Sequence, residues 1–224
     1  MIERGEFAEL HCLSNYSFLR GASHPEELVY KASDLGYSAI AITDECSYSG
    51  LVKAHVAAKQ CGIKLIVGAE FFVDMAHGEE KNSVENIIML APTRQAYGQL
   101  SAFISKIRRK NQKGNSYLRY EDCQIGISDC LILWSPKLQD IDIQVSVGQK
   151  LKTIFQHFWI TLELFQDGFD IDKTAQALTL SSRLNLRLVA SNNVHTHVPE
   201  RQPLQDIITS IRYQCSLEEL GHQT

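Results

Sequence analysis

The sequence predicts an α/β fold in which short apolar strands alternate with amphipathic helices. Seven apolar runs of strand length recur along the chain, and most are followed by a segment with helical spacing of its apolar residues. Several of these runs are apolar throughout rather than alternating, which is typical of parallel strands covered by helices on both faces. Both an open doubly wound sheet and a closed barrel satisfy this pattern.

The first third of the chain is predicted to run strand, helix, strand, helix, strand. The strands are expected at residues 7–11, 38–43 and 63–68. Ser23 is the predicted N-cap of the first helix, because Glu26 stands three residues later as in a capping box and Pro25 suits the first turn. Gly36 is the predicted stop of this helix, and Gly62 is the predicted stop of a second helix over 50–61.

The remaining two thirds continue the alternation more loosely. Further strands are expected at 86–91, 129–134, 159–164 and 186–191, and helices at 93–109, 143–157, 171–185 and 203–213. Two segments do not fit, a charged loop at 74–83 and a basic run at 108–116. A solvated helix end followed by a loop is the simpler interpretation of the basic run, and direct contact with phosphate groups is the alternative.

Length and composition narrow the classes of protein. A chain of 224 residues suits one α/β domain, and 44% hydrophobic with 21% charged residues excludes a mainly disordered chain. The formal net charge of −4 argues against a dedicated nucleic-acid-binding domain. No signal peptide or bilayer-spanning segment is recognisable, so we expect a cytoplasmic protein without a membrane partner. The six cysteines include no C-x-x-C pair and are expected to be reduced and mostly buried.

Polar side chains gather where the predicted strands end, namely His11, Asp44, Glu70 and His195. The carboxyl ends of strands form the active-site face of α/β barrels, so these side chains are expected to share one cleft. Such a group would suit a divalent metal ion, although each residue could equally be a hydrogen-bonded structural one. The sequence contains no dinucleotide-binding, P-loop, nucleophile-elbow or H-E-x-x-H motif.

Three stretches resemble the PHP (polymerase and histidinol phosphatase) domain of bacterial C-family DNA polymerases, and most closely their error-prone branch. They are FAELHCLSNYSFLRG at 7–21, AIAITDE…GLVKAHVAAKQCGIKLIVGAEFFV within 39–73, and ASNNVHTHVPERQPLQDIITSIR at 190–212. The resemblance covers essentially the whole chain in the correct order. It implies a single-domain, distorted seven-stranded β/α barrel over 1–213, with residues 214–224 starting the connection toward a polymerase core.

The chain departs from the metal-binding pattern that the resemblance implies. His11, Glu70 and His195 match ligand positions, and Asp44 is expected to orient them. Other positions of the family's site hold Leu13, Arg20, Glu45, Asn86 and Asn193. Leucine supplies no ligand and arginine adds a positive charge, so we expect no multi-metal hydrolytic site. At most one weakly bound Zn²⁺ or Mn²⁺ is expected on the three remaining ligands, and Arg20 is expected to pair with Glu45 or Glu70 instead.

The resemblance implies the N-terminal PHP domain of an error-prone DNA polymerase similar to the DNA polymerase III alpha subunit. Its expected role is mainly structural, its expected partner is the polymerase core of the same protein, and DNA contact is expected only through that parent. Templated nucleotidyl transfer with Mg²⁺ on palm carboxylates, and with it replication and repair of damaged DNA, would belong to the parent. An active metal-dependent PHP phosphoesterase or 3′–5′ exonuclease is the alternative, and a free-standing interaction module is another.

Overall fold

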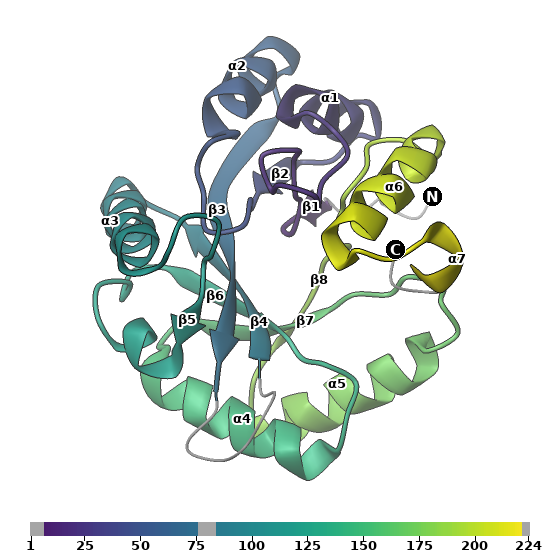
Figure 1. The fold of residues 1–224 in the computed structure, drawn as a ribbon. Helices are drawn as coiled ribbons and strands as arrows, with labels where there is room; N and C mark the ends of the chain where they lie inside the picture. Colours follow the sequence, from purple (N-terminus) through teal and green to yellow (C-terminus); the bar gives the residue numbers. More distant parts are fainter. Residues whose placement is uncertain (1–6, 76–83, 221–224) are drawn as a thin grey trace, which may run out of the picture. The chain divides into compact units, whose positions relative to one another are not determined.

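The computed structural model describes residues 7–75 and 84–220 (Figure 1). The chain divides into two compact units, each of which is described by itself. Unit 1 consists of Met1–Val67 and Asn193–Thr224, and unit 2 consists of Gly68–Asn192. Strands and helices alternate along both stretches, so the predicted α/β class is confirmed.

Unit 1 contains a parallel arrangement of strands in the order β1-β2-β3. Its elements are β1 (Ala8–Glu9), α1 (Pro25–Asp34), β2 (Ala39–Ile42), α2 (Leu51–Cys61), the first part of β3 (Lys64–Asp74), η2 (Pro199–Arg201), α6 (Gln202–Tyr213) and α7 (Leu217–Leu220). The register places Glu9 opposite Ile40, and Ile40 opposite Leu65. A further parallel bridge joins Cys12 to Val194, so the two ends of the sequence meet within this unit.

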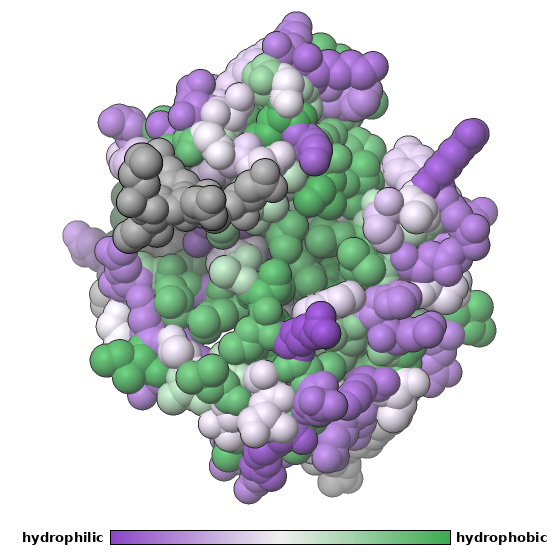
Figure 2. All heavy atoms as spheres, turned by 180° about the vertical axis from the view of Figure 1, so that it is seen from behind, coloured by the Kyte–Doolittle hydropathy of each residue, from purple (hydrophilic) through white to green (hydrophobic). Residues whose placement is uncertain are grey.

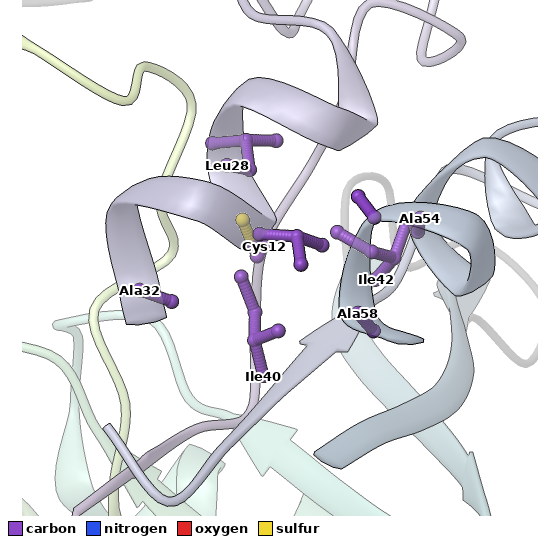
Figure 3. Packing of buried hydrophobic residues seen from close by; sticks show 9 residues of the cluster. Cys12, Leu28, Ala32, Ile40, Ile42, Ala54 and Ala58 are labelled. Carbon is purple, nitrogen blue, oxygen red and sulfur yellow. The ribbon is translucent and has the colours of Figure 1, made fainter. Parts of the chain in front are cut away.

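The core of unit 1 lies between β2 and the helices α1 and α2. Figure 3 shows side chains from these three elements pointing toward one another around Cys12. Alanines on both helices keep the helix backbones close to Ile40 and Ile42 of the strand. The buried cluster comprises Cys12, Leu28, Val29, Ala32, Ile40, Ile42, Ala54, Ala57 and Ala58. Burial, with Glu9 and Asp44 nearby, raises the pKa of the Cys12 thiol, which therefore packs as a small neutral side chain.

The first helix begins one residue later than predicted. His24 rather than Ser23 is the N-cap, and the His24 backbone N–H donates to Oε2 of Glu27 at 2.8 Å, so Glu26 is not the reciprocal partner. The Ser23 hydroxyl instead accepts from the backbone N–H of His197 at 2.9 Å and lies 2.7 Å from that ring's Nδ1. The Ser23 side chain therefore binds a residue far along the chain instead of capping the helix, as the local motif predicts.

Gly36 and Gly62 end α1 and α2 as predicted. Both have left-handed backbones, with φ of +74° and +78°, which residues with a Cβ adopt only with strain. The strand that follows is longer than predicted, because β3 runs through to Asp74 rather than ending at residue 68. Glu70 therefore lies within the strand, not after it. Most of the charged loop predicted at 74–83 lies outside the described residues.

Unit 2 contains strands in the order β3-β4-β6-β7-β8, with β5 paired to β3. Its elements are the second part of β3, β4 (Val84–Ala91), α3 (Arg94–Lys110), β5 (Leu118–Arg119), η1 (Tyr120–Gln124), β6 (Leu131–Ser135), α4 (Ile141–Ile154), β7 (Phe158–Leu162), α5 (Asp170–Leu184) and β8 (Leu188–Ala190). The predicted parallel pairing is confirmed for β6, β7 and β8, whereas β4 and β6 are antiparallel. The sequence prediction missed the short β5 and η1, and α7 lies in the segment predicted as a connection.

Two predictions from composition can be compared with the structure. The six cysteines form no disulfide, and four of them are buried, namely Cys12, Cys46, Cys123 and Cys130. Burial raises the pKa of Cys123 to about 12 and that of Cys130 to about 11, which keeps both thiols protonated.

Among the described helices, none combines the length and apolar character needed to cross a membrane. Figure 2 shows hydrophobic residues reaching the surface among hydrophilic ones.

A buried polar group interrupts the core of unit 2. Glu85 on β4 is 1% exposed, and its Oε2 accepts a hydrogen bond from Nε1 of Trp134 at 2.9 Å. Among the described residues its Oε1 has no hydrogen-bond partner of ordinary geometry, and the buried Gln144 side chain is a polar neighbour that acts to lower its pKa. Burial raises the pKa of Glu85, although the bond from Trp134 and the charge of Lys137 oppose the shift. Burial therefore makes ionisation of this carboxyl group less favourable in the folded protein than in the unfolded chain.

We expect Glu85→Gln to stabilise the protein at neutral pH. A carboxyl group with a raised folded-state pKa gives its full stabilisation below the unfolded pKa and loses it as pH rises through the folded value. Glutamine is neutral throughout, so the free energy of unfolding should increase by roughly 1 kcal/mol near pH 7 and change little near pH 4.5. Urea unfolding at both pH values measures this, with the exposed Glu200→Gln as control. Equal effects at the two pH values would contradict the prediction.

Candidate functional site

Asp44, which follows β2, is the centre of a hydrogen-bonded group in unit 1. The backbone N–H of Ser14 donates to Oδ1 at 2.8 Å, and the Ser14 hydroxyl lies 2.9 and 2.8 Å from the two carboxylate oxygens. The Ser17 hydroxyl donates to Oδ1 at 2.7 Å and accepts from the Glu45 backbone N–H at 3.0 Å. Burial raises the pKa of Asp44, and these hydrogen bonds oppose the shift. Asp44 thus fixes the course of the loop that begins at Ser14.

That loop is too tight to accept a side chain at its end. A Cβ added to Gly21 would lie 2.2 Å from the Ser14 carbonyl oxygen, a backbone atom that cannot move aside cheaply. Leu19 has a left-handed backbone with φ of +58°, and the Ala22 N–H donates to the His195 carbonyl oxygen at 3.0 Å. The loop therefore holds Arg20 in one defined position beside the segment that carries His195.

His11 and His195 are brought together by backbone pairing. The His11 carbonyl oxygen accepts from the Val194 N–H at 2.9 Å, and the Leu13 N–H donates to the Val194 carbonyl oxygen at 2.8 Å. His11 and Leu13 are both 0% exposed. Leu13 therefore adds an apolar side chain to the interior at a position where the resemblance implies a ligand histidine.

Side-chain amides flank both ring nitrogens of His195. Its Nε2 lies 3.1 Å from Oδ1 of Asn193, and its Nδ1 lies 3.5 Å from Nε2 of Gln205 on α6. Because the Asn193 oxygen can only accept, Nε2–H of the His195 ring is the donor in that contact. The Gln205 amide also donates to the Arg20 carbonyl oxygen at 2.7 Å. Sequence reasoning missed Gln205, whose only signal is a glutamine among the apolar residues of the last helix.

Arg20 forms an ion pair with Glu45, one of its two predicted partners. Its Nη1 lies 3.1 Å from Oε2 of Glu45, and the two side chains are 7% and 25% exposed. A guanidinium and a carboxylate therefore neutralise each other at two positions where the resemblance implies metal ligands.

Glu70 belongs to unit 2, where it is 0% exposed on β3. The Asn86 amide on β4 donates to Oε1 of Glu70 at 2.7 Å. Asn86 thus holds the carboxylate by a hydrogen bond at a position where the resemblance implies a histidine. A second buried carboxylate, Glu163, follows β7 and accepts from the Ser135 hydroxyl at 3.0 Å. Sequence reasoning did not select it, because the strand predicted at 159–164 includes position 163, whereas β7 ends at Leu162.

The structure places three of the four predicted site residues, His11, Asp44 and His195, in unit 1. Within residues 7–75 and 84–220, no group of three or more His, Cys, Asp or Glu side chains is arranged to hold a metal ion. That Glu70 shares a cleft with the two histidines stays a prediction. A crystal structure tests it: we expect Glu70 and His195 at the same end of the sheet, and opposite ends would contradict it.

We expect Arg20→Ala to destabilise the protein more than a surface change such as Arg94→Ala. Removing one partner of a fully buried ion pair costs about 3–5 kcal/mol, and an exposed pair contributes about 1 kcal/mol or less. The partial exposure of Glu45 places the expected loss between these limits. Thermal melts of both variants measure the difference. Equal shifts would mean that the Arg20 side chain contributes no more than an exposed arginine.

Comparison with known proteins agrees with the family suggested by the sequence. The PHP domain family matches residues 9–158. The error-prone DNA polymerase of Methylococcus capsulatus is 45% identical over 218 residues, and that of Dechloromonas aromatica is 41% identical over 224 residues. These matches cover 96% and 97% of this chain but only 20% and 21% of the relatives, so the chain spans about a fifth of their length.

Solved structures share the fold at low sequence identity. An amidohydrolase from Chromobacterium violaceum has a TM-score of 0.65 at 16% identity, covering 84% of this chain and 87% of the other. A candidate metal-dependent phosphoesterase from Bifidobacterium adolescentis has a TM-score of 0.58 at 12% identity, with 85% and 88% covered. On the family match and the close relatives together, the chain belongs to the PHP domain family.

Proposed function

We propose that this PHP domain is a structural part of an error-prone DNA polymerase similar to the DNA polymerase III alpha subunit. The observation that carries the proposal is the identity of 38–45% with error-prone DNA polymerases over nearly the whole chain. The relatives are about five times longer, so the rest of such a protein would supply the polymerase core. The core would be the partner of this domain, and DNA would be reached through it.

The side chains at the remnant site support a structural role. A hydrolytic metal cluster needs several anionic ligands to offset the charge of the ions and to place the attacking oxygen. Here Asp44 accepts hydrogen bonds from two serines, Glu70 accepts one from Asn86, and Arg20 adds a guanidinium. The residues therefore do not fit a multi-metal cluster, and the proposal includes a degenerate metal site that holds at most one weakly bound ion.

The chemistry of the parent protein would lie outside this chain. Templated nucleotidyl transfer uses two Mg²⁺ ions held by carboxylates of a palm domain, and the resemblance places none of those carboxylates among these residues. Error-prone synthesis would place the parent in the replication and repair of damaged DNA, in the cytoplasm. The PHP domain would contribute stability and surface to that protein rather than a reacting group.

A metal-dependent phosphoesterase or 3′–5′ exonuclease is the second candidate, because His11, Glu70 and His195 are retained. A single ion on these three side chains could polarise a phosphate oxygen. This candidate predicts an activity that depends on added metal and on His11. The structural proposal predicts no such activity, so one assay distinguishes the two.

We expect the purified chain to neither extend a primer nor remove its 3′ nucleotides, with Mg²⁺, Mn²⁺ or Zn²⁺ present. The reason is the depleted ligand set together with the missing palm. A labelled primer annealed to a template measures both reactions. His11→Ala and His195→Ala serve as controls for contaminating nucleases, since a contaminant would be indifferent to them. Degradation of the primer that His11→Ala abolishes would overturn the structural proposal in favour of the nuclease.

A further inference from the structure

Helix α6 of unit 1 buries two polar residues, whereas three of its four aliphatic residues are exposed and the fourth, Ile208, is half-buried. Gln205 and Thr209 are only 5% and 6% exposed, whereas Leu204, Ile207 and Ile211 are 40%, 47% and 54% exposed. An ordinary surface helix turns its apolar stripe toward the core. Most of the apolar surface of α6 therefore faces outward, which is the expected arrangement for a helix with a second partner.

Hydrogen bonds fix the orientation of this helix. The Gln205 amide donates to the Arg20 carbonyl oxygen at 2.7 Å and to the Thr209 hydroxyl at 3.3 Å. The Thr209 hydroxyl donates in turn to the Gln205 carbonyl oxygen at 2.7 Å. Rotating α6 to bury its apolar face would break the hydrogen bond from Gln205 to the Arg20 carbonyl oxygen, which costs free energy. The apolar face is therefore held outward.

The outward face is continuous along the helix. Leu204, Ile207 and Ile211 stand at positions i, i+3 and i+7, the spacing with which an amphipathic helix enters a hydrophobic groove. We call these three residues the α6 stripe. Leu217, at the start of the neighbouring α7, is 55% exposed and adds to the apolar surface of this C-terminal segment.

We infer that the α6 stripe packs against the polymerase core, in the part of the longer chain that lies outside the fifth matched here. The inference rests on the proposed function and names the surface through which the domain meets its partner. About four fifths of the relatives' length is available to cover the stripe, and the resemblance places the core beyond the C-terminal segment to which α6 belongs. The stripe carries no charge, so the contact is expected to be an apolar one.

Helix α2 offers a matched comparison within the same unit. Val52 and Val56 are 73% and 51% exposed at positions i and i+4, so they also form an apolar surface pair. Unlike α6, however, α2 buries apolar residues on its other face, namely Ala54, Ala57 and Ala58. The orientation of α2 is explained by the alanines that it buries, so it needs no second partner. Single exposed valines are common on the surfaces of soluble proteins.

The test uses a polymerase in which residues 1–224 replace the matching fifth of the Methylococcus capsulatus relative. Ile207→Cys and Val56→Cys are introduced separately, and maleimide labelling at each position is followed by peptide-resolved mass spectrometry. We expect labelling at position 207 to be at least about tenfold slower in the long protein than in the 224-residue chain, and labelling at position 56 to be unchanged. If the chimera is not soluble, the aligned positions of the relative's own polymerase give the same readout.

Each outcome of this experiment has a definite meaning. Equal labelling rates at position 207 in the short and long proteins would overturn the inference, and the proposed function would stand if the long protein still extends primers. Slow labelling in the short chain with the mass of a dimer would overturn it in favour of self-association. A long protein that folds but does not extend primers, with position 207 fully reactive, would overturn the proposed function as well.

Discussion

The hydrogen bonds that Asp44 accepts are the constraint on which the site region of unit 1 depends. A buried carboxylate is tolerated only when its oxygens are satisfied, and here the donors all come from the loop that starts at Ser14. Because Ser17 both donates to Asp44 and accepts from the Glu45 backbone, the loop and the end of β2 are tied together. The position of Arg20 follows from this tie, since Arg20 lies only three positions after Ser17.

The side chains of this region bind mostly to one another, although the buried Oε1 of Gln205 has no hydrogen-bond partner among the described residues. Opposite charges meet in Arg20 and Glu45, an amide flanks each nitrogen of His195, and Leu13 fills space with carbon. Each contact gives a polar atom a partner inside the protein, where the resemblance would place a metal ion. The same set also anchors α6 through Gln205, so it links the interior of the unit to the exposed stripe that we propose as a docking surface.

Much of the fold could be predicted from the sequence because its signals are local. Gly36 and Gly62 end helices wherever the surrounding chain goes, since only a residue without a Cβ adopts their backbone freely. Local signals fail at Ser23. Its local motif predicts an N-cap, but the Ser23 hydroxyl binds His197, 174 residues away, instead. The outer face of α6 was equally out of reach, because periodicity predicts a helix without saying which side its partner covers.

The sequence predicted one pair of the candidate site but not the residues that hold the site in place. The pairing of Arg20 with Glu45 could be anticipated because the resemblance places both at one site and their charges are opposite. The role of Ser17 could not, since a serine in a loop carries no signal of the carboxylate it will bind. Gln205 was missed for the same reason, because its partner is a backbone carbonyl 185 residues away.

The ion pair of Arg20 and Glu45 also constrains how such a domain can change over evolutionary time. Replacing either residue alone removes this ion pair and leaves a partly buried charge of the other sign, so single steps are disfavoured. Two coordinated replacements avoid that penalty. Positions 20 and 45 should therefore change together among related chains, and a lineage that has acquired this pair would return to metal binding only through an intermediate less stable than either end state.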